Sequence, residues 1–150
     1  MTDDLARVAR AIVDAGRYMT LATADGGGVP WASPVWYAPA GYGEFLWVSD
    51  PEARHSRNVA LRPEVGLVIF DSGAPIGTGQ GIYVAAVAEQ VADTELERGI
   101  DVFSRRSLEQ GGGAWTVEDV RAPARLRLYR ARAVETFVGD RNDRRVRVEL

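Results

Sequence analysis

The residues best suited to chemistry lie together in the run DPEARHSRN, residues 50–58. A capping serine or aspartate followed by proline predicts the start of a helix here. The free backbone N–H groups of a helix start, its positive dipole end and nearby arginines together suit a phosphate group. The alternative is a solvated helix face whose arginines pair with carboxylates, and the pattern alone leaves both open. The side chains at issue are Arg54, His55, Ser56, Arg57 and Asn58.

Three further places could contribute to a site. Trp36 and Tyr37 could form the wall of a site for a flat aromatic ligand, and Pro34 beside them frees backbone carbonyls from ladder pairing. From the residues alone, the favoured interpretation is that such aromatics fill a core or a subunit interface. Gln80 follows a glycine-bearing loop, where its amide could contact a polar ring edge or simply be solvated. His55 could act as a base, but without a serine nucleophile motif hydrolysis is not predicted.

The composition removes several chemistries. The 150 residues include no cysteine and a single histidine, and all 18 basic residues are arginine. Without lysine there is no Schiff base and no Walker-type phosphate loop. Without cysteine there is no thiol nucleophile, disulfide or cysteine-bound metal, and one histidine cannot build a histidine metal site alone. No metal site is therefore predicted, and demanding chemistry would come from a bound cofactor.

The charge pattern bears on partners and location. The net charge is −3, although residues 121–150 hold nine arginines against four acids. In RLRL (125–128) and RRVRVEL (144–150) the arginines alternate with apolar residues. This alternation is typical of strands whose arginines lie on the solvent-exposed face of a sheet. We therefore expect no nucleic-acid partner. No run approaches a signal peptide or the roughly 20 apolar residues of a membrane span, and the lack of cysteine suits the cytoplasm.

The elements that must position these residues are mostly strands. Glycines 111–113 predict a flexible turn, and TVED at 116–119 predicts a capping box that opens a short helix. The phase of the apolar residues slips between positions 128 and 131, which predicts a bulge. Helices are predicted over 3–15, 51–61 and about 94–107, and strands over 18–24, 29–38, 44–49, 65–71 (buried on both faces), 80–92, 125–138 and 144–149.

These elements predict one mainly β domain over residues 1–150, with helices outside a small antiparallel barrel. Three runs in this order and spacing resemble the pyridoxamine 5'-phosphate oxidase-like family: LATADGGGVPWASPVWY, FLWVSDPEARHSRNVALRPEVGLVIF and GQGIYVAAVAEQV. The likeness covers about residues 17–92. It implies an α+β split β-barrel of Greek-key type with six to seven strands, and a homodimer that binds FMN at the subunit interface. Some relatives use a deazaflavin coenzyme instead, and a few bind haem.

The resemblance also implies roles for individual residues. Arg54 and His55 match the phosphate contacts, with His55 where relatives commonly have lysine. The strand from Ser33 to Trp36 matches the one that borders the flavin ring, and Gln80 matches a glutamine that reaches the cofactor. The implied cofactor set is Ser33, Pro34, Val35, Trp36, Val48, Ser49, Arg54, His55, Ser56, Arg57, Asn58 and Gln80. No catalytic acid or base is assigned.

Two departures from the family bear on the substrate. Ala32 and Ser33 stand where the vitamin-processing oxidases have an arginine, and the end of the chain, GDRNDRRVRVEL, lacks their tryptophan- and arginine-bearing motif for pyridoxal phosphate. The expectation is therefore an FMN-dependent oxidoreductase for a small molecule other than pyridoxamine phosphate. The alternatives are a deazaflavin-dependent reductase and a non-enzymatic flavin- or haem-binding protein.

Overall fold

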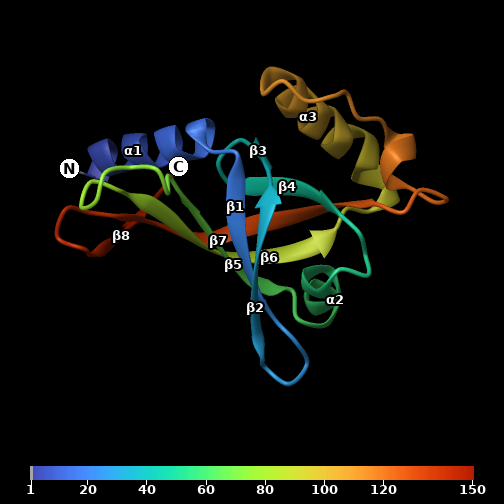
Figure 1. Ribbon diagram of the computed structural model, residues 1–150, viewed down its shortest axis with the longest axis horizontal. Helices are drawn as coiled ribbons and strands as arrows, with labels where there is room; N and C mark the ends of the chain where they lie inside the picture. The colour runs from blue at the N-terminus through green and yellow to red at the C-terminus, as the bar shows by residue number, and fades with distance from the viewer. Residues whose placement is uncertain (1) are drawn as a thin grey trace.

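A computed structural model describes residues 2–150, which form one curled antiparallel sheet with helices around it (Figure 1). The strand order is β2-β1-β5-β6-β7-β4-β3, and β8 pairs with β7. The architecture confirms the predicted mainly β, split-barrel class. The strands are β1 (Tyr18–Ala24), β2 (Pro30–Trp36), β3 (Ala38–Ala40), β4 (Glu44–Ser49), β5 (Glu64–Phe70), β6 (Gly81–Gln90), β7 (Arg127–Gly139) and β8 (Arg145–Val148). The helices are α1 (Thr2–Ala15), α2 (Arg54–Leu61) and α3 (Leu96–Glu109), with short 3₁₀ helices at Asp93–Glu95 and Val117–Val120.

Two hydrophobic cores lie on opposite faces of the sheet. The larger core joins the apolar side of α1, including Val13, to inward residues such as Leu21 and Leu67. The smaller core packs α3 against β4 and β7, where Phe103 and Leu128 belong to the same cluster. Alternate residues of β4 divide between the cores, so this strand is buried on both faces. The arrangement fixes α3 beside the ends of β2 and β4, where the site lies (Figure 1).

The bulge in β7 lies later than the sequence predicts. The pairing of β6 with β7 is regular until it shifts between Ala85 and Ala86, which leaves Val134 as the extra residue. The apolar phase slip near residue 128 has another cause, because Leu128 belongs to the α3 core and Ala131 to the α1 core. Both faces of that part of β7 are buried, so alternation is lost without any bulge.

Several predicted boundaries also change. The helix predicted from residue 51 begins at Arg54, because Asp50 accepts the backbone N–H groups of Glu52 (2.9 Å) and Ala53 (3.0 Å) in a turn before it. The predicted strand 29–38 is interrupted at Tyr37, whose backbone N–H donates to Arg17 O at 3.2 Å. β5 is buried on one face only. Within residues 2–150, no helix has both the length and the apolar character needed to cross a bilayer.

Candidate functional site

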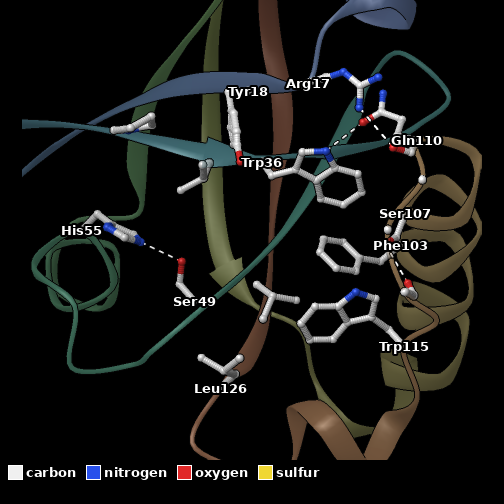
Figure 2. Close-up of a pocket in the computed structure, with 16 residues that line it drawn as sticks. Arg17, Tyr18, Trp36, Ser49, His55, Phe103, Ser107, Gln110, Trp115 and Leu126 are labelled. Carbon is white, nitrogen blue, oxygen red and sulfur yellow. Dashed lines mark hydrogen bonds between the residues drawn. The ribbon is translucent and has the colours of Figure 1, made fainter.

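A cavity of about 700 Å³ lies between α3 and the ends of β2 and β4 (Figure 2). One wall consists of β2, the end of β4 and His55 of α2, and the other consists of α3 and the segment that follows it. This volume is within the range of cofactor and small-molecule sites. Its lining residues are Arg17, Tyr18, Pro34, Val35, Trp36, Val48, Ser49, His55, Phe103, Ser107, Gln110, Gly111, Gly112, Gly113, Trp115 and Leu126.

The α2 wall contains a polar pair. His55 Nε2 lies 2.8 Å from Ser49 Oγ, and the two side chains face each other across the gap between β4 and α2 (Figure 2). Burial lowers the pKa of His55 below its ordinary value of 6.5. The imidazole is therefore neutral at pH 7, and it offers a hydrogen bond to a ligand in place of a charge.

The helix that bears His55 begins without a side-chain cap among the described residues. Its first backbone N–H groups, at Arg54, His55 and Ser56, precede the first intrahelical bond, which Arg57 N–H donates to Ala53 O at 3.0 Å. These donors and the positive end of the helix dipole lie beside the His55 wall of the cavity, an arrangement that suits an anion.

The α3 wall is aromatic. Phe103 lies between Trp36 and Trp115, with ring centroids 4.9 Å and 5.3 Å away and nearly perpendicular ring planes on both sides. Trp36 Nε1 donates to Gln110 Oε1 at 2.8 Å, so the indole of Trp36 is held from α3. Figure 2 shows the three rings facing the Ser49–His55 pair across the cavity.

Hydrogen bonds tie the end of α3 to the end of α1 and the connection that leads from it into β1. Gln110 Nε2 donates to Gly16 O at 3.3 Å, and Arg106 donates to Asp14 O at 2.8 Å and to Gly16 O at 3.1 Å. Arg17 Nη1 donates to Gln110 O at 3.3 Å. The aromatic wall is therefore anchored to the α1–β1 connection by side-chain hydrogen bonds at one end of α3, in addition to its apolar core.

The glycine run after α3, which the sequence predicts to be a flexible turn, forms hydrogen bonds to the last turn of the helix. Gly111 has φ +85°, which ends the helix in a left-handed conformation. Gly112 N–H donates to Ser107 O at 2.8 Å, and Ser107 Oγ donates to Gly113 O at 2.7 Å. A Cβ at Gly112 would lie 2.5 Å from Ser107 Oγ, so a larger residue here would displace the Ser107 hydroxyl from Gly113 O.

Half of the predicted cofactor residues line the cavity. Those that do are Pro34, Val35, Trp36, Val48, Ser49 and His55. Those outside its lining are Ser33, Arg54, Ser56, Arg57, Asn58 and Gln80. Tyr37, considered as a ligand wall, is instead fully buried: its hydroxyl donates to Val13 O at 2.7 Å, and burial raises its pKa to about 12.

The residues outside the lining have identifiable surroundings. The Arg54 guanidinium lies over the Trp31 ring, 4.3 Å from its centroid, on the exposed side of α2. Asn58 is buried and donates to Thr23 Oγ1 at 3.0 Å, which joins α2 to β1. Gln80 lies beside a separate groove along α1 and donates to Gly139 O at 2.9 Å. Cofactor contacts by these residues stay predictions.

The lining residues that the sequence did not predict come mainly from α3 and the segment after it. The sequence predicts only that Phe103 belongs to the hydrophobic core, because it lies on the apolar face of its predicted helix. Gln110 and Trp115 are remote in sequence from β2 and carry no motif. A tryptophan just after a glycine run was the one available signal for this wall.

The chain belongs to the pyridoxamine 5'-phosphate oxidase family, whose model matches residues 5–138. The structural resemblance extends to proteins with different described roles. No curated protein matches the sequence.

Three solved structures illustrate the range of the fold. HutZ, the haem storage protein of Vibrio cholerae, superposes with TM-score 0.72 at 21% identity, covering 89% of this chain and 94% of that one. An F420 reductase gives TM-score 0.63 at 16% identity, with 85% and 94% covered. The conserved hypothetical protein Rv2991 of Mycobacterium tuberculosis gives TM-score 0.67 at 26% identity, with 92% and 85% covered. Because the first two are distant in sequence, they establish the fold and not the ligand.

Proposed function

We propose that this protein is an FMN-dependent oxidoreductase that acts on a small molecule other than pyridoxamine phosphate. The observation that carries the proposal is the meeting of three features at one wall of the 700 Å³ cavity. These are the uncapped start of α2, the Ser49–His55 pair and the end of β2. The family match over residues 5–138 supports the same conclusion.

The residues present fit a flavin. The start of α2 and the exposed Arg54 and Arg57 would hold the phosphate, with His55 and Ser49 as neutral hydrogen-bonding partners. The backbone of β2 near Pro34 and the ring of Trp36 would border the flat ring system. When bound, a flavin supplies hydride transfer, while these residues bind it, orient it and limit water around it.

Haem fits less well than a flavin. His55 is the only histidine of the chain, and its Nε2 is already engaged with Ser49 Oγ at 2.8 Å. Axial ligation of haem iron through Nε2 would require this hydrogen bond to break. A flavin requires no such change, since its phosphate and ring are recognised by hydrogen bonds and stacking.

Pyridoxamine phosphate is disfavoured as the substrate because a second phosphate needs a second cationic site. Among the described residues, Arg17 is the only arginine that lines the cavity, and its Nη1 donates to Gln110 O, so a dianionic phosphate would meet a single, partly engaged cation here. The aromatic wall opposite His55 offers no further cation.

The proposal includes a homodimer with the cofactor at the subunit interface. A row of small residues crosses four strands on the face of the sheet away from α1, formed by Ala32, Ala22, Gly66 and Ala85. The next row on that face is also uncharged and consists of Pro34, Thr20, Val68 and Tyr83. Pro34 also lines the cavity, as does the 59% exposed Tyr18, so a second copy on this face would border the site.

Binding of FMN to the purified protein tests the proposal. Arg54→Ala should raise the FMN dissociation constant more than tenfold, about 1.4 kcal/mol, because it removes a cation at the start of α2. The matched control is Arg7→Ala, which removes an exposed arginine paired with Asp4 on α1 and should leave the constant unchanged. Titration with coenzyme F420 in parallel separates the deazaflavin alternative. Unchanged FMN affinity in a folded Arg54→Ala variant, or much tighter F420 binding, would contradict the FMN assignment.

A further inference from the structure

Two of the three rings of the aromatic wall, Phe103 and Trp115, are not among the predicted cofactor residues. All twelve of those residues precede α3, and none comes from α3 or from the segment 111–126. Phe103 and Trp115 nevertheless line the same cavity, facing the Ser49–His55 wall across it (Figure 2). Trp36 lies at the junction of the two walls.

The wall is built to present apolar ring surface. The perpendicular packing of Phe103 against both tryptophans fixes all three rings relative to one another. Trp36 has its indole N–H occupied by Gln110 Oε1, so this ring adds surface without a free donor. Val48 and Leu126 continue the apolar lining beside the wall. Such a surface favours a flat, polarisable ligand.

The polar groups around the wall restrict the ligand further. Among residues 2–150, the ionisable side chains that line the cavity are Arg17, Tyr18 and His55, and no carboxylate does. Both ends therefore present hydrogen-bond donors, from the Arg17 guanidinium at one end and the Ser49–His55 pair at the other. A cation would find no carboxylate to balance its charge, whereas a carbonyl or similar acceptor on a ring would meet these donors.

We propose that Trp36, Phe103 and Trp115 form a second-ligand subsite for a planar, uncharged aromatic molecule that carries a hydrogen-bond acceptor. The subsite lies beside the part of the cavity near Ser49 and His55 where the cofactor is proposed to bind. Its assignment as the substrate site rests on the proposed function. Gln110 is a positioning residue for it, because it holds the Trp36 indole from the end of α3.

The chain's four tryptophans provide the test. In a ¹⁵N–¹H spectrum each indole N–H gives one signal, and Trp→Phe variants assign them. Coumarin, which is planar, uncharged and bears a carbonyl, should shift the signals of Trp36 and Trp115. The signals of Trp31, beside Arg54, and of Trp47, buried in the α1 core, should stay in place. Octahydrocoumarin keeps the carbonyl but loses planarity, and it should bind at least threefold more weakly.

A matched pair of variants locates the binding. Phe103→Leu keeps apolar volume but removes the central ring, and it should weaken coumarin binding about threefold or more. Leu108→Ala, on the exposed side of the same helix, should not. An unchanged Trp47 signal shows that each variant is folded.

The titration is done on the protein as purified and again with saturating FMN. Coumarin shifts that persist with FMN support the second-ligand subsite. Displacement of coumarin by FMN, equal binding of octahydrocoumarin, or no shift at Trp36 and Trp115 would overturn it. Coumarin binding in a protein that takes up no FMN would contradict the proposed function but would still support an aromatic ligand site at these three rings.

Discussion

His55 shows how burial changes the chemistry of a single residue. Its ring lies half-buried between α2 and β4, with Nε2 2.8 Å from Ser49 Oγ. Desolvation lowers its pKa below 6.5, so folding favours the neutral imidazole. His55 therefore contributes a neutral hydrogen-bonding group to the cavity wall, and under the proposed function the cationic role falls to Arg54 and Arg57.

The lowered pKa of His55 predicts how stability depends on pH. In the window between the ordinary pKa of 6.5 and the lower folded value, the unfolded chain binds more protons than the folded one. The free energy of unfolding should therefore fall as pH drops through this window, by at most about 1.4 kcal/mol per pH unit, and this contribution should be constant above it. Urea unfolding at pH 8.0, 6.5 and 5.5 measures the effect.

The control for this prediction is His55→Gln, which keeps a hydrogen-bonding group but does not titrate. The variant should lose less stability than the wild type between pH 8.0 and 5.5. Carboxylates with lowered pKa values, such as Asp50 and Glu95, start from 3.8 and 4.5 and titrate below this window. Parallel pH profiles for the two proteins would show that His55 is not the group responsible.

Residue types predicted one wall of the cavity and not the other. The run around His55 carries arginines, a helix start and a preceding strand end, which local rules connect to phosphate binding. Phe103 and Trp115 carry no comparable local signal, because their role depends on α3 packing against Trp36, 67 positions before Phe103. A contact of that kind follows from tertiary packing and not from sequence spacing.

At the scale of elements, the junction of α1, β1 and α3 supports the aromatic wall. Gly16 ends α1, and its carbonyl accepts from both Arg106 and Gln110 of the α3 end. Its missing side chain also makes room for Tyr37: a Cβ at Gly16 would lie 2.3 Å from the Tyr37 hydroxyl and 2.9 Å from Ile69 Cγ2. Gly16 therefore connects the end of α1 with the end of α3 through its carbonyl, and it lets Tyr37 and Ile69 of β5 pack closely against the backbone.

Gly16→Ala should destabilise the protein by about 1–3 kcal/mol, because the added methyl group overpacks a buried site and displaces Tyr37 from Val13 O. Gly43→Ala is the matched control, since a Cβ there meets nothing within 4 Å and its φ is not positive. That variant should be neutral or slightly stabilising. Urea midpoints with unchanged slopes measure both, and equal stability of the two variants would contradict the packing argument.

Element types were predictable, whereas the start of α2 and the position of the bulge in β7 were not. The capping box at Thr116 is present as the sequence predicts, because both of its hydrogen bonds are local. The start of α2 shifted by three residues, since Asp50 bonds to the turn ahead of the helix. The bulge lies at the exposed Val134, whereas the phase slip that suggested a bulge comes from an earlier part of β7 that is buried on both faces.

At the scale of the whole molecule, the arginine-rich end of the chain is largely matched by carboxylates. Arg130 is almost fully buried and bonds to Glu89 at 2.8 Å and Glu95 at 2.6 Å. Among the described residues, six of the nine arginines in 121–150 form ion pairs with acids, namely Arg121, Arg125, Arg130, Arg132, Arg145 and Arg147. Most of the arginines in this part of the chain therefore have a carboxylate partner within the protein.

The two uncharged rows on the outer face of β2, β1, β5 and β6 are the surface that the proposed dimer would bury. Ala22 lies in its small-residue row and is exposed, paired with Ala32 on one side and Gly66 on the other. Ala22→Arg places a long charged side chain on this face and should convert a dimer into a 16.3 kDa monomer in sedimentation experiments. If a partner borders the cavity, FMN binding should weaken in the same variant.

Ala60→Arg is the control, because Ala60 is exposed on α2, which packs on the other side of the sheet, and it should leave the mass unchanged. A wild-type protein that sediments as a monomer at micromolar concentration would contradict the dimer, and a monomeric variant with full FMN affinity would place the cofactor within one chain.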